Sequence, residues 1–390
     1  MLRFLAGRLV GTLVVLWVIV TLSFFLMRFA PGGPFDADRK LRPNIEANKW
    51  LIFGMGVELT APVDGIVTRF EPLAVQSTEH ASGTLLATIA PTAGGAPVNI
   101  ILPYDGPLVS LALDPETAIG ATVAAGSRLA VVPKPLYQQY FDSIGSYVQL
   151  DFGKTFASEG TRDVSEVLLT ALPISFTLGA MALGFALFFG TLAGLLAGLR
   201  HNSWVDYTVM SGAMFGASVP TMVSGPLFLA IFALGLQIFP VSGWEATQGD
   251  WSTWQHRVLP VVTLGLAYVP TIARLTRGGM LEVIKSDWIR TARAKGVPDH
   301  RIVTRHALKG ALLPTVSWLG PGVASIVTGS IVVERIFGIP GLSEHFVTPA
   351  INRDYPMVIG VIVVYSAILV ILNLFVDIAY TFLDPRVKVS

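Results

Sequence analysis

The chain has 390 residues, of which 52% are hydrophobic and only 14% are charged. Because soluble domains carry about 25% charged residues, this composition excludes an ordinary soluble domain and indicates a membrane protein. The formal net charge of +1 says nothing about charged partners, and the absence of cysteine excludes disulfides, thiol nucleophiles and cysteine-ligated metals.

Six uncharged apolar runs predict a mainly helical, polytopic membrane protein with six transmembrane helices, each of which needs about 17–25 residues. The fourth run is short, but Arg257 and Arg274 at its ends can extend to the interfaces. A removable signal peptide is the alternative for residues 1–30. That run is longer than the usual ~7–15 residues and no clean cleavage site follows, so we expect a first transmembrane helix. The runs are 9–27, 173–199, a long run within 207–244, 258–273, 310–333 and 355–376.

Basic residues in the loops predict the orientation. Segment 274–309 carries nine Lys and Arg against three acidic residues, so it should face the cytoplasm. The loop at 200–206 and the tail at 384–390 fall on the same side. We therefore expect both termini in the cytoplasm and residues 31–172 outside the cell membrane.

The first part of this outer segment, 31–136, contains an internal repeat. The sequence APVDG from Ala61 recurs loosely as LPYDG from Leu102, and SGTLLATI from Ser82 recurs as AGSRLAVV from Ala125. Each half predicts short apolar strands joined by Asp-Gly and Gly turns.

We therefore predict a small β-domain at about 57–133. Its two-fold pattern resembles the biotinyl/lipoyl-like barrel-sandwich domain, which carries its cofactor on a lysine between the halves. Because no lysine occurs between Lys49 and Lys134, we expect no covalent lipoate or biotin. A generic small β-domain is the alternative.

The second part, 137–172, predicts two amphipathic helical pieces around a glycine-rich turn, with apolar residues at helical spacing from Tyr140 to Val148. The turn contains Gly153-Lys154-Thr155. A phosphate-binding loop needs another glycine five residues before Gly153, and that position is Val148. We therefore expect no ATPase site in this chain.

Glycines spaced four residues apart lie within two of the predicted spans. Such stripes let helices approach closely in a membrane. They fit either packing within the chain or a contact between subunits. The stripes are Gly190, Gly194 and Gly198 in the second span and Gly212 and Gly216 in the third.

The polar and basic stretch 286–314 lies between two apolar runs and predicts a helix, a glycine turn and a second helix. Ser286 or Asp287 can cap the first helix, and Gly296 can adopt the left-handed conformation that ends it. Asp299 can cap the second. On charge alone, the stretch would be an ordinary basic cytoplasmic loop.

The order of residues in this stretch favours a more specific interpretation than a basic loop. The segment TARAKG at 291–296, followed by RHAL at 305–308 and Leu313-Pro314, is similar to the EAA loop of ATP-binding-cassette importer permeases, in its dipeptide/oligopeptide version. Arg290 stands where the broader family has the Glu of the EAA triplet. Further segments follow the peptide-permease pattern: 28–34, 328–337, 339–342, 352–356, 373–380 and 383–386.

The chain thus resembles permease subunits of dipeptide/oligopeptide importers over about 1–36 and 137–390, but not over the β-rich insertion. The resemblance implies the type I importer permease fold, with a five-helix core at 173–383 and a cytoplasmic coupling loop at 282–310. In this family the loop helix docks in a groove of the ATPase subunit. Its expected coupling residues are Trp288, Ile289, Arg290, Thr291, Ala292, Arg293, Ala294, Lys295 and Gly296.

The resemblance also implies a non-catalytic subunit that forms the translocation pathway for peptides or peptide-like solutes in the bacterial cytoplasmic membrane. The implied partners are a second homologous permease, two ABC ATPase subunits, an extracytoplasmic solute-binding protein and the lipid bilayer. We expect no cofactor, metal or nucleic acid. Peptides of any length, nickel, glutathione and peptide-like antibiotics all remain open as cargo.

Two other classes of protein are alternatives. An ion-coupled secondary carrier would keep ionisable residues near the bilayer midplane, whereas the six runs carry no charge. An export assembly protein with an adaptor-like domain would explain the insertion but not the EAA-like loop. Asp377, near the end of the last run, predicts a buried ion pair with Arg274 or Arg8; an exposed interfacial Asp377 is equally compatible.

Overall fold

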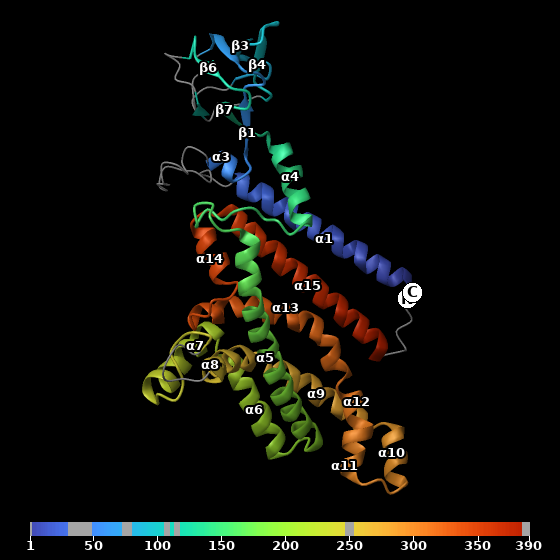
Figure 1. The fold of residues 1–390 in the computed structure, drawn as a ribbon. Coiled ribbons are helices and arrows are strands. Elements are labelled where there is room, and N and C mark those ends of the chain that lie inside the picture. The colour runs from blue at the N-terminus through green and yellow to red at the C-terminus, as the bar shows by residue number, and fades with distance from the viewer. Residues whose placement is uncertain are drawn as a thin grey trace. The chain divides into compact units, whose positions relative to one another are not determined.

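The computed structural model describes residues 2–29, 49–71, 80–104, 110–112, 118–245 and 253–383 (Figure 1). The chain divides into two compact units, which are described separately. Unit 1 comprises Met1–Leu22, Leu168–Pro349 and Val361–Ser390, and unit 2 comprises Ser23–Val167 and Ala350–Gly360.

Unit 1 is helical, and most of each of the six predicted apolar runs lies in helix. Two described helices are long and apolar enough to cross a membrane, and two bent pairs of helices bring the number to as many as four. The predicted count of six crossings stays a prediction. The helices are α1 (Leu2–Phe29), α5 (Val164–Leu199), α6 (Trp204–Ser218), α7 (Thr221–Phe228), the π-helical η1 (Leu229–Gly235), α8 (Thr253–Leu266), α9 (Val269–Ile284), α13 (Leu313–Ile336), α14 (Glu344–Ile351) and α15 (Tyr355–Leu383).

Three boundaries differ from the prediction. The third run is broken between α6 and α7, because Pro220 precedes α7 in an extended conformation and cannot donate a helical hydrogen bond. Helix α5 begins at Val164 rather than at 173. Helix α9 continues past Arg274 to Ile284, so the first turns of the predicted cytoplasmic loop are helical.

Helices α5 and α9 pack at backbone distance along the glycine stripe. A Cβ atom at Gly194 would lie 2.5 Å from the Ala273 carbonyl oxygen, and one at Gly190 would lie 2.7 Å from the Ile272 Cβ. A Cβ at Gly198 would lie 2.8 Å from the Met280 Cβ. The stripe on α5 therefore serves packing within the chain, one of the two alternatives that the sequence left open.

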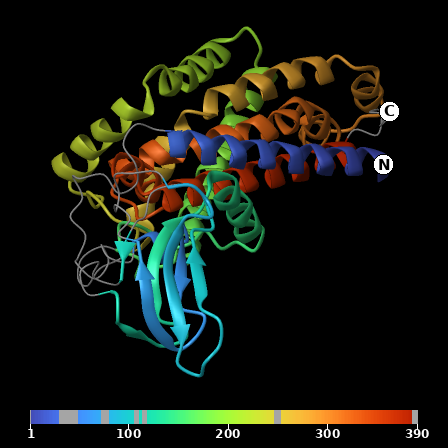
Figure 2. The ribbon, with the colours of Figure 1, turned by 90° about the horizontal axis from the view of Figure 1, so that it is seen from above.

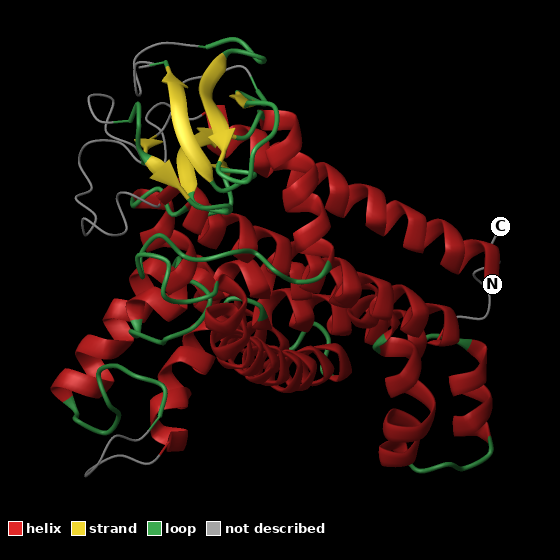
Figure 3. Ribbon diagram, turned by 45° about the horizontal axis from the view of Figure 1, so that its top comes forward, coloured by secondary structure: helices red, strands yellow, loops and turns green. Residues whose placement is uncertain are grey.

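The described part of unit 2 contains seven short strands in two antiparallel sheets, drawn in blue to blue-green in Figure 2 and in yellow in Figure 3. One sheet has the order β1-β7-β5 and the other β4-β3-β2-β6. Their apolar faces share one core that includes the fully buried Val67, Leu86, Ile89, Leu102 and Leu129. The strands are β1 (Gly56–Thr60), β2 (Gly65–Phe70), β3 (Leu85–Pro91), β4 (Val98–Ile101), β5 (Ser110–Leu111), β6 (Thr122–Val123) and β7 (Arg128–Pro133).

The two halves of the sequence repeat exchange equivalent hydrogen bonds. In each half, the glycine of the SG or AG pair donates its N–H to the carbonyl of the residue that precedes the other half's Pro-x-Asp-Gly segment. That residue donates its own N–H back. The bonds are Gly83 N to Leu102 O at 2.8 Å, Leu102 N to Thr84 O at 2.9 Å, Gly126 N to Ala61 O at 2.8 Å and Ala61 N to Ser127 O at 2.9 Å. This reciprocity gives the repeat a physical basis, while the likeness to a lipoyl-like domain stays a prediction.

Unit 2 also contains α3 (Lys49–Ile52) and one amphipathic helix, α4 (Leu136–Val148). The second predicted helical piece corresponds to a turn-rich segment and the start of α5. Asp354, which is fully buried, holds this segment against the start of α15. Its carboxylate accepts the N–H of Ala157 at 2.8 Å and the hydroxyl of Thr155.

Replacing Gly194 by Val tests the contact between α5 and α9. The new side chain would meet the α9 backbone, which cannot rotate away, and overpacking of this kind costs about 1–3 kcal/mol. Gly184 lies on the same helix with nothing within 4 Å of its Cβ position, so Gly184→Val is a matched control for helix propensity. Thermal unfolding in detergent should show a clearly lower midpoint for Gly194→Val. Equal midpoints for the two variants would show that the close contact does not stabilise the bundle.

Candidate functional site

The stretch 286–314 folds in unit 1 as a helix, a tight turn and a second helical arm. Figures 1 and 3 show the two arms side by side, joined by the turn. The elements are α10 (Asp287–Ala294), α11 (Asp299–Arg301), the π-helical η2 (Ile302–Ala307) and α12 (Leu308–Ala311).

Gly296 ends α10 in the way the sequence predicts. Its φ is +73°, a left-handed conformation that costs a residue with a side chain about 1–2 kcal/mol. The Gly296 N–H donates to the Arg293 carbonyl at 3.0 Å, and the Val297 N–H donates to the Ala292 carbonyl at 3.2 Å. This paired bonding is the Schellman motif, and it sets the direction in which the chain leaves α10.

Ser286 occupies the predicted N-cap position without a side-chain cap bond, and the predicted capping role of Asp299 is wrong. Ser286 occupies the N-cap position, but its hydroxyl donates backward to the Val283 carbonyl at 2.6 Å. Pro298 precedes the second arm, and Asp299 is the first residue inside it. The Asp299 carboxylate instead lies 3.6 Å from the Arg293 guanidinium, an exposed pair that links the two arms weakly.

The nine expected coupling residues divide between two faces of α10 and its end. Ile289 and Ala292 are buried and pack with α9, η2 and α12 through Met280, Val283 and Ile302, so they hold the helix in place. The other seven are exposed: Trp288, Arg290, Thr291, Arg293, Ala294, Lys295 and Gly296. We call these seven residues the α10 surface. Trp288 is its one large apolar side chain, with 57% of its surface exposed.

Helix α9, which precedes α10 directly, is packed closely on several sides. Besides the α5 stripe, it meets α12 at Gly279, where a Cβ would lie 2.3 Å from the Ala311 carbonyl oxygen. It meets α13 through a buried hydrogen bond of 3.0 Å between the hydroxyls of Thr276 and Thr315. The α10 surface is thus carried on a helix that has little freedom to move alone.

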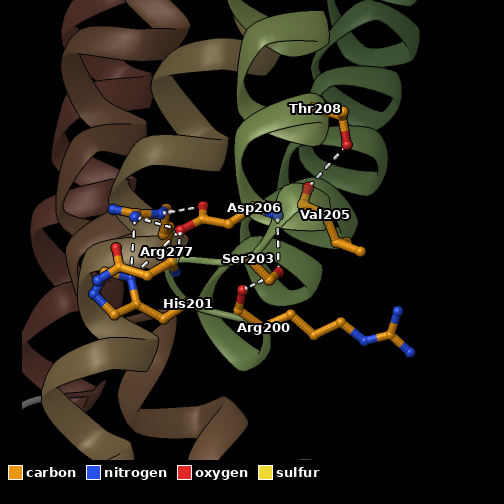
Figure 4. A network of polar contacts seen from close by, with 8 residues as sticks. Arg200, His201, Ser203, Val205, Asp206, Thr208 and Arg277 are labelled. Atoms are coloured by element: carbon orange, nitrogen blue, oxygen red, sulfur yellow. Dashed lines mark hydrogen bonds and ion pairs between the residues drawn. The ribbon is translucent and has the colours of Figure 1, made fainter.

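An ion pair that the sequence did not reveal joins α9 to the start of α6 (Figure 4). The Arg277 Nε and Nη2 atoms lie 2.7 and 2.6 Å from the two carboxylate oxygens of Asp206. The Asp206 residue is 1% exposed. The Asn202 N–H also donates to the Asp206 carboxylate, at 3.0 Å. A two-point contact of this kind fixes both distance and orientation.

His201 borders the same pair. Its Nδ1 atom lies 3.1 Å from Arg277 Nη2 and 3.4 Å from Asp206 Oδ2. The spacing Ser203-x-x-Asp206 is a helix-start signature, and Ser203 does accept the Asp206 N–H, at 3.4 Å. That signature could have located Asp206, but nothing local in the sequence points to a partner 71 residues away.

A second buried carboxylate, Glu334, lies one residue beyond the fifth predicted run and within α13. It is fully buried and accepts the Ser343 N–H at 3.0 Å. A Cβ at Gly341 would lie 2.4 Å from its Oε2 atom. Ser175 of α5 accepts the neighbouring Leu342 N–H at 2.9 Å. These contacts hold the turn after α13 against α5 and α13.

The predicted ion pair of Asp377 stays a prediction. The side chains of Asp377 and Arg8 lie outside the described residues, and Arg274 is exposed. Within the described ranges, no group of three or more His, Cys, Asp or Glu residues could hold a metal ion.

Comparisons with known proteins identify relatives. Residues 190–389 match the family model of the binding-protein-dependent transport system inner membrane component. The chain is 33% identical over 388 residues to the oligopeptide transport system permease protein OppB of Haemophilus influenzae, and the match covers all of both chains. It is 41% identical over 254 residues to the dipeptide transport system permease protein DppB of Bacillus subtilis, which covers 65% of this chain and 80% of DppB.

Among solved structures, an inward-facing MetNI methionine ABC transporter is similar with a TM-score of 0.47 and 17% identity. That match covers 56% of this chain and 96% of the MetNI chain.

Removing the Arg277 guanidinium tests the ion pair. Arg277→Met leaves the Asp206 carboxylate buried without its cation. Removing one partner of a fully buried pair lowers the free energy of unfolding by about 3–5 kcal/mol. We expect a smaller loss here, because Arg277 is partly exposed. Arg274→Met is the control, since Arg274 lies on the same helix and is exposed. We expect Arg277→Met to lower the unfolding midpoint and a further Asp206→Asn change to restore part of it. Equal effects of the two Arg substitutions, or no restoration, would contradict a coupled pair.

Proposed function

The chain belongs to the family of binding-protein-dependent transport system inner membrane components, and from this premise we propose that it is the permease subunit of an ABC importer for peptides or peptide-like solutes. The peptide cargo is supported by the names of its relatives, an oligopeptide permease OppB and a dipeptide permease DppB. The observation that carries the proposal is the exposed α10 surface at the end of the closely packed α9.

The proposed role of this surface follows from how α9 is held. A chain without a phosphate-binding loop must receive the work of ATP hydrolysis from another subunit, through a surface that the other subunit can contact. Force applied to α10 reaches α9 directly through Ile289 and Ala292, which pack on Met280 and Val283. Because α9 is packed at backbone distance on α5 and α12 and tied to α6, those helices would move with it.

The partner subunits and the orientation of the chain are part of the same proposal. We place a second homologous permease, two ABC ATPase subunits and an extracytoplasmic solute-binding protein around this chain, in the type I permease arrangement. The α10 surface and both termini would face the cytoplasm. The β-domain would lie outside, on the side where the binding protein delivers its cargo.

An exposed tryptophan on the α10 surface gives the sharpest test. Aromatic residues at the centre of an interface often contribute more than about 1–2 kcal/mol, or about tenfold in affinity. Trp288→Ala should therefore reduce the amount of ATPase subunit that co-purifies with the tagged full-length chain from bacterial membranes. Trp254→Ala is the matched control, because Trp254 is equally exposed, at 62%, but lies in a predicted outer segment.

Two results would contradict the proposal. If no ATPase subunit co-purifies with the unmodified chain, the permease role fails. If Trp288→Ala and Trp254→Ala retain the ATPase equally, and both still support transport into vesicles, the α10 surface is not the coupling site.

We also propose that the β-domain acts as a structural or docking module and carries no covalent group. The link from β3 to β4 contains Gly94 and Gly95, both with positive φ, but no lysine. Amide-linked lipoate or biotin therefore has no attachment point between Lys49 and Lys134. The intact mass of the purified chain should equal the mass calculated from its sequence. A mass increase that maps to a peptide within 57–133 and matches either group would contradict this.

A further inference from the structure

Helix α4 turns polar side chains toward a cavity and leaves most of its apolar stripe exposed. Tyr137, Phe141 and Val148 are 64%, 68% and 81% exposed. With Ile144 they follow spacings of four, three and four residues, which places them on one side of a helix of 3.6 residues per turn. A helix on a water-facing surface has the opposite arrangement.

The polar side of α4 lines a cavity of about 380 Å³ within unit 2. Gln139, Asp142, Ser143 and Ser146 face it, and they lie half a turn away from the apolar stripe. Gln139 is buried and donates its amide to the Lys134 carbonyl at 2.6 Å. The Lys134 ammonium lies 2.7 Å from the Asp142 carboxylate. The Gln139 amide nitrogen, Lys134 and Asp142 therefore have partners within the protein, whereas the Gln139 Oε1 atom is buried without one among the described residues. The apolar face points away from these groups and is exposed.

Contacts between α4 and α1 indicate what the apolar face of α4 meets. The Tyr140 ring of α4 packs against Phe24 and Phe25 of α1, with centroid distances of 5.5 and 5.6 Å. These two residues lie in the last turns of the apolar stretch Val10–Leu26. On the same end of α1, Leu26 and Phe29 are each 70% exposed. The apolar surface of α4 is thus next to the end of the apolar helix that we expect to be the first transmembrane helix.

We propose that α4 lies along the outer surface of the bilayer, with Tyr137, Phe141, Ile144 and Val148 in the lipid. Its 13 residues span about 20 Å, too short to cross the hydrocarbon core of about 30 Å. Aromatic side chains favour the membrane interface. The helix has no Lys or Arg, so its membrane contact depends on apolar burial and not on anionic lipids.

This assignment gives α4 a second role. By sealing one side of the cavity and anchoring Lys134 at the end of β7, it connects the β-domain to the membrane surface through groups within unit 2. The inference rests on the membrane location of the family and not on the proposed peptide cargo, so either can fail without the other.

The absence of cysteine allows a direct test by spin labelling. Single-cysteine variants of the full chain, Phe141→Cys and Val148→Cys, are labelled with a nitroxide and placed in nanodiscs of phosphatidylethanolamine and phosphatidylglycerol. Collision rates are measured with oxygen, which concentrates in lipid, and with a water-soluble nickel chelate. Leu26→Cys on α1 serves as the lipid reference. Ile119→Cys in the β-domain, 64% exposed, serves as the water reference, and Ser146→Cys reports the cavity side.

We expect labels at 141 and 148 to match position 26, with oxygen collisions dominant and a depth of about 5–10 Å, whereas labels at 146 and 119 favour nickel. Nanodiscs of phosphatidylcholine alone should give the same result. Dominant nickel collisions at 141 and 148 would mean that the face is open to water, and shielding from both reagents would mean that another protein covers it. Either result overturns the proposal. If a variant does not fold, Tyr137→Cys on the same face replaces it.

Discussion

The arrangement of unit 1 depends on the absence of side chains where α9 meets its neighbours. At Gly194 and Gly279 a single carbon atom would lie 2.5 and 2.3 Å from a carbonyl oxygen of the facing helix, well inside van der Waals contact. In a membrane, where lipid is as apolar as the helices, packing at this range is a main source of association between helices. It also removes the space that α9 would need to slide or rotate by itself.

Polar contacts fix the helix register and the turns of this closely packed bundle. The Arg277–Asp206 pair fixes the register of α9 against α6 by two nearly parallel bonds. The turn at Gly296 fixes the direction of the chain beyond α10. Glu334 and Ser175 fix the turn after α13. Each of these sites lies at or near a helix end, where backbone groups lack partners within the helix.

The sequence predicted the elements that depend on local chemistry. Gly296 is left-handed because the residue after a helix often is, and the repeat from Ala61 and Leu102 marks two half-domains that bond reciprocally. Prediction failed where the decisive partner is distant. The basic segment that starts at Arg274 was predicted as a loop, yet α9 continues because Thr276, Gly279, Met280 and Val283 keep one face buried. Ser286 differs for a local reason, because its hydroxyl is oriented toward the carbonyl of Val283, three residues earlier, and makes no side-chain cap bond.

Helix α4 shows a limit of a different kind. Its periodicity is visible in the sequence, but a hydrophobic pattern gives only the difference between two faces and not which face is inside. In water the apolar face must be buried, so the direction is usually assumed. Here the Gln139 amide nitrogen and the Asp142 carboxylate have partners within the protein, while Phe141 and Val148 are exposed. The solvent, rather than the pattern, decides the orientation, and near a membrane the solvent on one side of a helix is hydrocarbon. On the bilayer surface where we propose that α4 lies, an apolar face that a soluble protein would have to cover needs no protein partner.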